Sequence, residues 1–526
     1  MPKILVSDQI SEKGLEILRQ EMEVDYLPGL SKEEIIARIP QYDAMMVRSG
    51  TKVTREIIEA GVNLKIIGRA GVGVDNIDVE TATRRGIVVV NSPGGNTRAA
   101  AEHTIALLLA LARNIPQAHM SLKQGEWKRS KFMGMEVFGK KLGIIGLGRI
   151  GREVARRAQG LGMEVIAYDP YISDEVAERM NIRLVDLPTL LETADVVTVH
   201  TPLTKETKHL IGEEELRMMK RGAKLINTAR GGIIDEMSLV KAIEEGIIGG
   251  AAIDVFEQEP PPPDHPLLKL DQVIVTPHLG ASTVEAQEYV AVDVAEQIVN
   301  FFKGIPPSSP VNLPVLPAEV LSFIQPYIPL MEKMGRLLAA IGGKRISKIE
   351  VSYQGEIGEV ETSPLTRSLL KGILEPVLSL PVNLVNAPII AESRGISVLE
   401  TKSTTPSEYT NLATATIYGD NEVRKVGGTV IGKGEPRIVN IDGYRVDFVP
   451  EGIILLTSHI DKPGIIGKVG TILGKNDINI AGMNVGREEK RGKAVMVLSV
   501  DESIPQDVLR EIEKIEGIEK AWVVEF

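Results

Sequence analysis

Residues Lys141–Pro170, KLGIIGLGRIGREVARRAQGLGMEVIAYDP, place two β-branched runs on either side of a helical segment. The first run ends in the motif GLGRIG, residues 146–151, and the second run ends in Asp169. Glycines at this spacing allow a tight turn, close approach of a pyrophosphate to the backbone, and close packing of the helix on the strand. The amino end of the helix offers N–H groups to phosphates. The stretch therefore predicts a strand–helix–strand unit that binds a dinucleotide.

The residue that ends the second strand bears on which dinucleotide is bound. A carboxylate at Asp169 can accept hydrogen bonds from ribose hydroxyls, and its charge repels a 2′-phosphate. No lysine or arginine immediately follows it. A glycine-rich turn alone also occurs for packing reasons, but the complete unit with its acidic residue favours a cofactor site. We expect NAD rather than NADP.

Outward from this unit, short β-branched runs alternate with amphipathic segments from residue 3 to about residue 300. This alternation predicts parallel sheets covered by helices on both faces. Ten such runs are too many for one half, so we expect two doubly wound α/β domains. The nucleotide-binding domain is assigned to residues 97–279, and the other domain to residues 1–96 and 280–305. A helix predicted over Thr97–Arg113 crosses between them.

The rest of the chain divides into three further pieces. Residues 306–317 are rich in proline, fit neither a continuous helix nor a strand, and are expected to be a linker. Residues 318–449 have the pattern of an α+β domain, with helical segments first and glycine-punctuated strands after them. Residues 452–526 follow the order βαββαβ, which is typical of a ferredoxin-like fold.

Composition limits the classes of function. The 526 residues carry a formal net charge of −11, spread along the chain, which argues against general nucleic-acid or membrane binding. The apolar run TIALLLALA is too short to span a bilayer, and the amino terminus lacks the apolar core of a signal peptide. The absence of cysteine excludes disulfides, thiolate metal sites and a cysteine nucleophile. We expect a cytoplasmic protein without a metal site.

Three chemically distinct side chains follow three predicted strands. Arg230 follows KLINTA, Glu259 lies just beyond GAAIDV, and His278 follows QVIVTP. The carboxyl ends of parallel strands meet at one edge of a sheet, where open α/β sheets bind ligands. A guanidinium can hold a carboxylate, an imidazole can take a hydroxyl proton, and a carboxylate can orient the imidazole. Singly, Arg230 fits a surface ion pair and Glu259 a loop charge equally well, but together the three favour oxidation of a hydroxy acid.

Four motifs in this order, GLGRIG, NTARGG, DVFEQEP and TPHLGAST, resemble the D-2-hydroxyacid dehydrogenase family. The whole chain resembles the long-form D-3-phosphoglycerate dehydrogenases within it, which carry an intervening domain and an ACT domain. The resemblance implies a flavodoxin-like substrate domain, a Rossmann NAD domain, and oxidation of D-3-phosphoglycerate to 3-phosphohydroxypyruvate at the start of L-serine synthesis. It also implies Arg230, Glu259 and His278 as the catalytic set, with His278 as the acid/base.

The resemblance also implies binding residues. Those predicted to contact NAD are Gly146, Gly148, Arg149, Ile150, Gly151, Asp169, Thr201, Thr228, Ala229, Asp254, Gly280 and Ala281, with Asp254 at the nicotinamide carboxamide. Those predicted to contact substrate are Arg48, Ser49, Arg69, Val72, Gly73, Asn96, Arg230 and His278. The family often has a hydroxyl residue where this chain has Val72, so that side-chain contact is lost. The arginines suit a phosphorylated acid with about three negative charges.

Two segments near the carboxyl terminus, LLTSHIDKPGIIGKVG and NDINIAGMNVG, resemble the ACT signature. The resemblance implies that His459, Asp461 and Asn479 bind L-serine as an effector between two such domains. A pure dimerisation module is the alternative. A homo-oligomer is expected, with a tetramer as its state.

Several alternatives stay open at this point. Trp127, Lys128 and Arg129 either reach a neighbouring subunit's active site or belong to a solvated basic loop. A second group, Lys433, Arg437 and Arg445, is either an anion site or ordinary surface charge. A glyoxylate or D-lactate type reductase on the same fold, and an NAD-sensing corepressor-like binding protein, are the competing functions.

Overall fold

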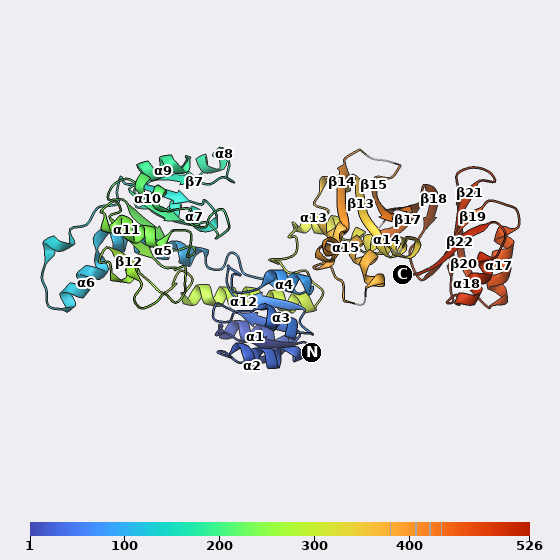
Figure 1. Ribbon diagram of the computed structural model, residues 1–526, viewed down its shortest axis with the longest axis horizontal. Helices are drawn as coiled ribbons and strands as arrows, with labels where there is room; N and C mark the ends of the chain where they lie inside the picture. The colour runs from blue at the N-terminus through green and yellow to red at the C-terminus, as the bar shows by residue number, and fades with distance from the viewer. Residues whose placement is uncertain (344, 379, 406–407, 420–421, 433) are drawn as a thin grey trace.

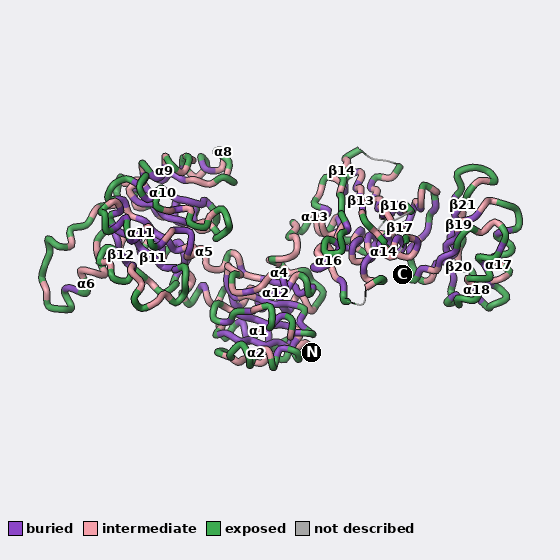
Figure 2. The backbone as a smooth tube through the Cα atoms, viewed as in Figure 1, coloured by how far each residue is buried: buried purple, intermediate pink, exposed green. Residues whose placement is uncertain are grey.

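The computed structural model describes residues 1–526 except 344, 379, 406–407, 420–421 and 433. Four units, each built on its own sheet, lie along an elongated molecule, with the amino-terminal unit between the second and the third (Figure 1). Buried residues concentrate in the strands and the inner faces of the helices of each unit (Figure 2). Within the described residues, no helix is long and apolar enough to cross a membrane.

The amino-terminal unit holds a five-stranded parallel sheet in the order β2-β1-β3-β4-β5, which is the flavodoxin-like order. Helix α12 returns from the far side of the second unit and packs on α1, where Gly14 approaches Ala291 too closely for any side chain. The strands are β1 (Lys3–Val6), β2 (Glu23–Tyr26), β3 (Ala44–Val47), β4 (Ile66–Arg69) and β5 (Val88–Val90). The helices are α1 (Glu12–Glu21), α2 (Lys32–Arg38), η1 (Ile39–Gln41), α3 (Arg55–Ala60), α4 (Val79–Arg84) and α12 (Val284–Phe302).

The second unit holds a seven-stranded parallel sheet in the order β12-β11-β10-β9-β6-β7-β8. The strand order reverses between β6 and β9, and this switch point is where Rossmann folds bind dinucleotides. Its strands are β6 (Lys141–Ile145), β7 (Glu164–Tyr168), β8 (Arg183–Leu184), β9 (Val196–Val199), β10 (Lys224–Asn227), β11 (Gly250–Ile253) and β12 (Val273–Val275). Its helices are α5 (Thr97–Arg113), α6 (Ile115–Lys123), η2 (Arg129–Phe132), α7 (Arg149–Gly160), α8 (Asp174–Glu178), α9 (Leu187–Thr193), α10 (Glu213–Met218), α11 (Glu236–Glu244) and η3 (Pro266–Lys269).

All ten predicted runs are strands, and two further strands, β2 and β8, were not predicted. Both lie at the edge of their sheets and carry no fully buried residue. An edge strand lacks the continuous apolar run that marks a strand buried on both faces. The sequences of β2 and β8 therefore lack the apolar pattern from which the other strands were predicted.

Part of the proline-rich segment 306–317, which is predicted to be a linker, also pairs with the edge of the first sheet. Val311 donates its N–H to the carbonyl of Val89, and a β-bridge joins Pro310 to Val90. The Asn312 side chain accepts the N–H of Val89 at 2.9 Å. Proline is tolerated beside β5 because an edge position needs few backbone donors.

The third unit is α+β, with one mixed six-stranded sheet in the order β14-β13-β15-β16-β17-β18. The expected arrangement of helices before strands is wrong in one respect, because β13 precedes α15 and α16. The strands are β13 (Ile346–Gly355), β14 (Ser397–Ser403), β15 (Asn411–Gly419), β16 (Val423–Ile431), β17 (Glu435–Ile441) and β18 (Tyr444–Phe448). The helices are α13 (Ala318–Ile324), α14 (Tyr327–Ile341), η4 (Glu356–Glu359), α15 (Ser363–Leu374), η5 (Glu375–Val377) and α16 (Ala387–Ser393).

The last unit has the βαββαβ order and an antiparallel sheet β20-β21-β19-β22, as expected for a ferredoxin-like fold. Its helices cover one face, and residues of the other face share a buried cluster with the third unit. The elements are β19 (Ile453–Ile460), α17 (Ile465–Lys475), β20 (Ile480–Arg487), β21 (Lys493–Val500), α18 (Gln506–Glu513) and β22 (Ile518–Glu525).

Candidate active site

The turn after β6 has the shape that a pyrophosphate needs. Gly146 has a φ of 93°, a left-handed conformation that favours glycine. A Cβ at Gly151 would lie 2.1 Å from the carbonyl oxygen of Gly146, so helix α7 can approach the strand only with glycine there. Open space surrounds the missing Cβ of Gly148. The turn therefore leaves room for phosphate oxygens at the start of α7.

Asp169 is held against this turn from the end of β7. Its Oδ2 accepts the N–H of Leu147 at 2.7 Å, and its Oδ1 accepts the N–H of Tyr171 at 2.9 Å. Thr201 packs its methyl group near Gly146, and its buried hydroxyl has no protein partner in the described part of the chain. An unpartnered buried hydroxyl beside a glycine-rich turn fits a bound dinucleotide. Arg149 is exposed and Ile150 half-buried at the start of α7.

His278 and Glu259 form a pair at the carboxyl edge of the sheet. Nδ1 of His278 lies 2.9 Å from Oε2 of Glu259 and 3.1 Å from Oε1. Burial opposes the charge on Glu259, but contact with His278 outweighs it and holds the pKa of that carboxyl below its usual value. An ionised carboxylate only accepts hydrogen bonds, so Nδ1 carries the proton and Nε2 of a neutral His278 has a free lone pair.

The backbone of His278 is itself unusual. It has a φ of 53°, a conformation that non-glycine residues adopt rarely and that gathers at functional sites. Its N–H donates to the carbonyl of Asp254 at 2.9 Å. A cavity of about 380 Å³ is lined by His278, Glu259 and Asp254. The pair therefore borders a cavity whose other lining residues, such as Phe256, Pro260 and Leu268, are mostly apolar.

Asp254 organises the loop that carries His278. Its side chain is fully buried and accepts the N–H groups of Leu279 at 2.7 Å and Gly280 at 3.0 Å. Thr276 donates its hydroxyl to Oδ1 at 2.6 Å, and Nε2 of His103 lies 3.2 Å from the same oxygen. Burial alone would raise the pKa of Asp254, but these contacts hold it below its usual value. The predicted bond from Asp254 to the nicotinamide carboxamide stays a prediction.

His103 was not singled out by the sequence, because nothing local links helix α5 to a strand end more than 150 residues later. It connects the crossover helix to the loop of His278 through Asp254. We expect His103→Ala to lower kcat/KM roughly tenfold, since a hydrogen bond to a buried charged group is worth about 1.5–3 kcal/mol. Steady-state kinetics check this, with partial recovery in His103→Asn. His119→Ala, on exposed α6, is the control and should leave kcat/KM unchanged.

Three guanidinium groups converge where the turn after β10 meets the first unit. Arg230 follows β10, and its Nε donates to Asp75 of the first unit at 3.0 Å. Burial and the neighbouring Arg230 lower the pKa of Arg69 to about 10, and Arg48 adds to the effect. Nε of Arg69 is buried without a hydrogen-bond partner among the described residues. An anionic ligand would offset the repulsion between these three cations.

The loop after β4 makes room for these arginines. A Cβ at Gly73 would lie 2.0 Å from Nη2 of Arg230, so glycine permits the approach. The carbonyl of Val72 accepts a hydrogen bond from Asn91. Asn96 caps the start of helix α5, and its buried side-chain Oδ1 has no hydrogen-bond partner among the described residues. Ser49 is exposed at the rim. Of these residues, Gly73 directly contacts the arginine cluster, and the roles of the others stay predictions.

Residues around Arg230 complete the turn after β10. The side chain of Asn227, which the sequence analysis missed, donates to the carbonyl of Arg230 at 2.8 Å and accepts the N–H of Ala229 at 3.0 Å. Thr228 shares a 2.7 Å hydrogen bond with Thr104 of α5. These bonds fix the direction in which Arg230 leaves the strand.

Comparisons with known proteins agree with this geometry over the full length. Residues 105–280 match the model of the D-isomer specific 2-hydroxyacid dehydrogenase NAD binding domain. Residues 323–442 match the D-3-phosphoglycerate dehydrogenase intervening domain, and residues 453–517 match the ACT domain. The D-3-phosphoglycerate dehydrogenase of Archaeoglobus fulgidus is 50% identical over 526 residues, covering 99% of this chain and 100% of the relative. The chain belongs to the D-3-phosphoglycerate dehydrogenase family.

Other family members and solved structures are similar as well. The Methanocaldococcus jannaschii dehydrogenase is 48% identical over 525 residues and is covered completely, as is this chain. A crystal structure of the TT0316 protein from Thermus thermophilus matches 59% of this chain and 99% of its own, with 36% identity and a TM-score of 0.56. A D-lactate dehydrogenase from Aquifex aeolicus, complexed with NAD and lactic acid, matches 57% of this chain and 96% of its own, with 29% identity and a TM-score of 0.52.

The predicted effector residues of this family member do not form one cluster within the chain. Asp461 pairs with Arg487 at 2.8 Å, near the start of β21. Asn479 donates to Asp501 at 2.6 Å, beyond the other end of β21. The eight residues of that strand span about 23 Å. His459 is buried beneath the helices, where burial lowers its pKa. A ligand that touches both Asp461 and Asn479 needs a second chain.

Two other predicted groups are placed as follows. Trp127, Lys128 and Arg129 lie on an exposed loop, and the Trp127 ring is 77% exposed. Lys433 lies outside the described residues. Arg437 pairs with Asp447 and Glu435, and Arg445 pairs with Glu408. The partners of Arg437 and Arg445 favour ordinary surface charge over an anion site.

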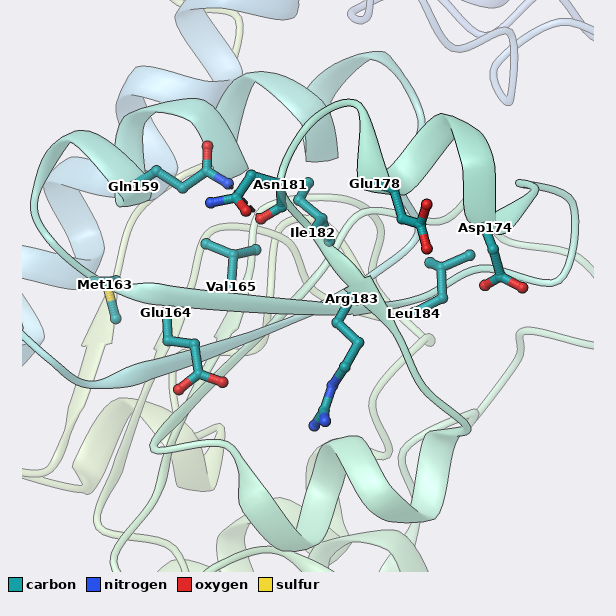
Figure 3. Close-up of a pocket in the computed structure, with 10 residues that line it drawn as sticks. All are labelled: Gln159, Met163, Glu164, Val165, Asp174, Glu178, Asn181, Ile182, Arg183 and Leu184. Atoms are coloured by element: carbon teal, nitrogen blue, oxygen red, sulfur yellow. Dashed lines mark hydrogen bonds between the residues drawn. The ribbon is translucent and has the colours of Figure 1, made fainter.

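A separate cavity of about 470 Å³ lies at the outer edge of the NAD-binding sheet (Figure 3). Figure 3 shows Glu164, Asp174 and Glu178 around Arg183, and none of its lining residues is a predicted site residue. The surplus of carboxylates disfavours an anionic dinucleotide there. The turn after β6 therefore stays the predicted site of the cofactor. Within the described chain, no group of three or more His, Asp or Glu side chains is arranged to hold a metal ion.

His200, which follows β9 beside the glycine-rich turn, predicts an acid-sensitive step in stability. Burial lowers its pKa to about 4. The unfolded chain, with an ordinary histidine pKa near 6.5, then binds a proton first, so stability is complete above about pH 6.5 and falls as the pH drops toward 4. Denaturant unfolding at pH 7 and pH 5 should show a loss about 2 kcal/mol larger in wild type than in His200→Gln. Equal losses in the two chains would contradict this.

Proposed function

We propose that this protein oxidises D-3-phosphoglycerate to 3-phosphohydroxypyruvate with NAD, the reaction that opens phosphorylated L-serine synthesis. The observation that carries the proposal is the His278–Glu259 pair at the carboxyl edge of the sheet that also carries the dinucleotide turn and Arg230, one of three clustered arginines. The full-length similarity to D-3-phosphoglycerate dehydrogenases supports the same substrate. The predicted site residues and a cytoplasmic location are parts of this proposal.

Each group has a distinct task in the reaction. Arg230 binds the substrate carboxylate as a fork and polarises the reacting oxygen, while Arg48 and Arg69 bind the phosphate. Nε2 of His278 takes the proton from the C2 hydroxyl, and Glu259 stabilises the imidazolium that forms. NAD, when bound, supplies the acceptor for the C2 hydride. Loss of the proton and the hydride leaves a carbonyl at C2, which balances the oxidation.

Comparing three acids tests the substrate. We expect kcat/KM for D-3-phosphoglycerate to exceed that for D-glycerate and D-lactate by at least about a hundredfold, because two charge-assisted contacts to phosphate are lost in the smaller acids. Arg69→Gln should remove most of this preference, while Arg85→Gln, on the outside of the same domain, should keep it. Equal activity on all three acids in wild type would favour the alternative, a glyoxylate or D-lactate type reductase.

The family's third possibility, an NAD-sensing binding protein, predicts cofactor binding without turnover. The intact His278–Glu259 pair argues against it, since a sensor needs no group that accepts a proton from a substrate hydroxyl.

Feedback control by L-serine is a second part of the proposal, and it requires a homo-oligomer. Strand β20 pairs with β21 on one side and with no described strand on the other. Its Ile480, Ala481 and Met483 are exposed, it contains no proline, and its one charged residue, Arg487, stands at its end. Two β20 strands paired antiparallel would bring Asn479 of one chain to Asp461 of the other. A tetramer is the expected assembly.

Mixed chains test this arrangement. Calorimetry should show L-serine binding to wild type and none to Asp461→Ala or Asn479→Ala alone. Co-expressed Asp461→Ala and Asn479→Ala chains form mixed dimers in which one site is intact and the other doubly altered. In mixed dimers purified away from both homodimers, half the wild-type number of sites should therefore return. A site made within one domain would show no recovery.

A further inference from the structure

A second ligand cavity lies in the third unit, away from the dehydrogenase site. It measures about 390 Å³ and opens between α15, α16 and β14. Ser363, Thr366 and Arg367 line one side, Glu392 lies on α16, and Leu370 and Ile396 supply apolar surface. The cavity therefore combines one cation, hydroxyl groups, carboxylate and aliphatic walls.

Arg367 offers one edge of its guanidinium to this cavity. Nη1 donates to the backbone carbonyls of Leu384 at 2.9 Å and Val385 at 3.4 Å. Nε makes only a long 3.4 Å contact with Ser363, and Nη2 has no partner in the described chain. The side chain is half-buried and pairs with no carboxylate there. The Nε–Nη2 edge is the one that binds carboxylates in bidentate fashion.

The two carboxylates of the cavity differ in what they already bind. Glu400 accepts hydrogen bonds from the hydroxyls of Thr362 and Thr366, the second at 2.6 Å. Glu392 has no hydrogen-bond or ion-pair partner within the described residues. The cation of Arg367 and the carboxylate of Glu392, neither of which has an ionic partner among the described residues, match the two charges of a zwitterion. The excess negative charge would repel a phosphorylated dianion. The aliphatic walls match an apolar side chain.

We propose that this cavity binds a small α-amino acid with an aliphatic side chain. Its carboxylate lies on Arg367, its ammonium group faces Glu392, and its side chain packs on Leu370 and Ile396. Neither the dehydrogenase reaction nor the L-serine site described above uses any of these residues.

The loop 381–387 connects the cavity to the substrate domain. Val385, whose carbonyl Arg367 holds, is 3% exposed and belongs to the buried cluster of β5 in the substrate domain. Asn383 donates to the carbonyl of Gly86, just before β5, at 2.7 Å. Asn91 follows β5 and binds the carbonyl of Val72 in the predicted substrate loop. A ligand that redirects Arg367 therefore changes the KM for substrate.

Calorimetry on the full chain tests the binding, with L-leucine as the probe and Asn479→Ala as the background that removes the effector contact. We expect one site per chain. Binding of 4-methylpentanoate, which lacks the ammonium, and of 3-methylbutylamine, which lacks the carboxylate, should be roughly tenfold weaker. Arg367→Lys and Glu392→Gln should each weaken L-leucine to a similar degree, whereas Arg394→Lys, outside the cavity, should not.

Absence of L-leucine binding, or equal affinity in wild type and Glu392→Gln, would overturn the site. Because Glu392 lies at the exposed rim, Glu392→Gln still tests L-leucine binding if Arg367→Lys disturbs the loop. This binding measurement does not depend on the dehydrogenase reaction. For the coupling, L-leucine should shift the KM for D-3-phosphoglycerate in the Asn479→Ala chain but not when Asn383→Ala is added. An unchanged KM under saturating L-leucine would refute the coupling while the binding result stands separately.

Discussion

Replacing His278 with alanine should lower kcat roughly a hundredfold to ten-thousandfold, the range that a positioned acid/base contributes. The reason is local: Nδ1 of His278 is committed to Glu259, so Nε2 is the nitrogen left to take the substrate proton. NAD binding should stay near wild type, because the turn after β6 and Asp169 are untouched. Stopped-flow or steady-state NADH formation, together with a binding titration of NAD, measures both quantities.

Two comparisons make this result specific. His209→Ala removes another histidine that faces carboxylates, Glu257 and Asp235, and should leave kcat unchanged. Glu259→Gln should lie between wild type and His278→Ala, because the imidazole stays but loses the carboxylate that stabilises its charged form. Wild-type turnover in His278→Ala would assign the acid/base role to another group.

Arg230→Lys should lower kcat/KM for D-3-phosphoglycerate about a hundredfold. Lysine keeps the charge but loses the planar fork, which costs two charge-assisted hydrogen bonds to the substrate carboxylate and the reacting oxygen. The loss should appear in kcat as well as in KM, because polarisation of the reacting oxygen grows toward the transition state. Steady-state kinetics with D-3-phosphoglycerate provide the measurement.

Arg221→Lys is the matched control for Arg230→Lys. It changes an exposed arginine of the same domain, before β10, and should leave both constants unchanged. A KM effect alone in Arg230→Lys would limit Arg230 to binding. Arg69→Gln should differ from Arg230→Lys by raising KM for the phosphorylated substrate with a smaller effect on kcat.

The sequence predicted the parts of the fold that are buried on both faces. Strands such as β6 and β10 are runs of apolar residues, and that pattern is local. Strands β2 and β8 are exposed edges, and residues 309–312 pair with β5 although proline dominates their surroundings. Their structure is set by a neighbour distant in the sequence, so local pattern cannot indicate it.

The candidate site divides in the same way. Arg230, Glu259 and His278 were indicated because each follows a strand, and strand ends of a parallel sheet share one edge. Asn227 and His103 were not predicted because their importance depends on hydrogen bonds that form only in the folded chain. His103 reaches Asp254 across more than 150 residues, and Asn227 folds back onto the carbonyl of Arg230. The division of Asp461 and Asn479 between opposite ends of β21 likewise required the strand pairing.

Transfer of isotope from D-3-phosphoglycerate carrying deuterium at C2 is the most direct test of the central claim. With the purified chain and NAD, we expect the deuterium to appear in the nicotinamide ring of NADH while 3-phosphohydroxypyruvate forms in equal amount. In His278→Ala the same transfer should occur at a rate lower by at least about a hundredfold. Absence of NADH formation, or release of the deuterium to solvent, would contradict hydride transfer from this substrate at this site.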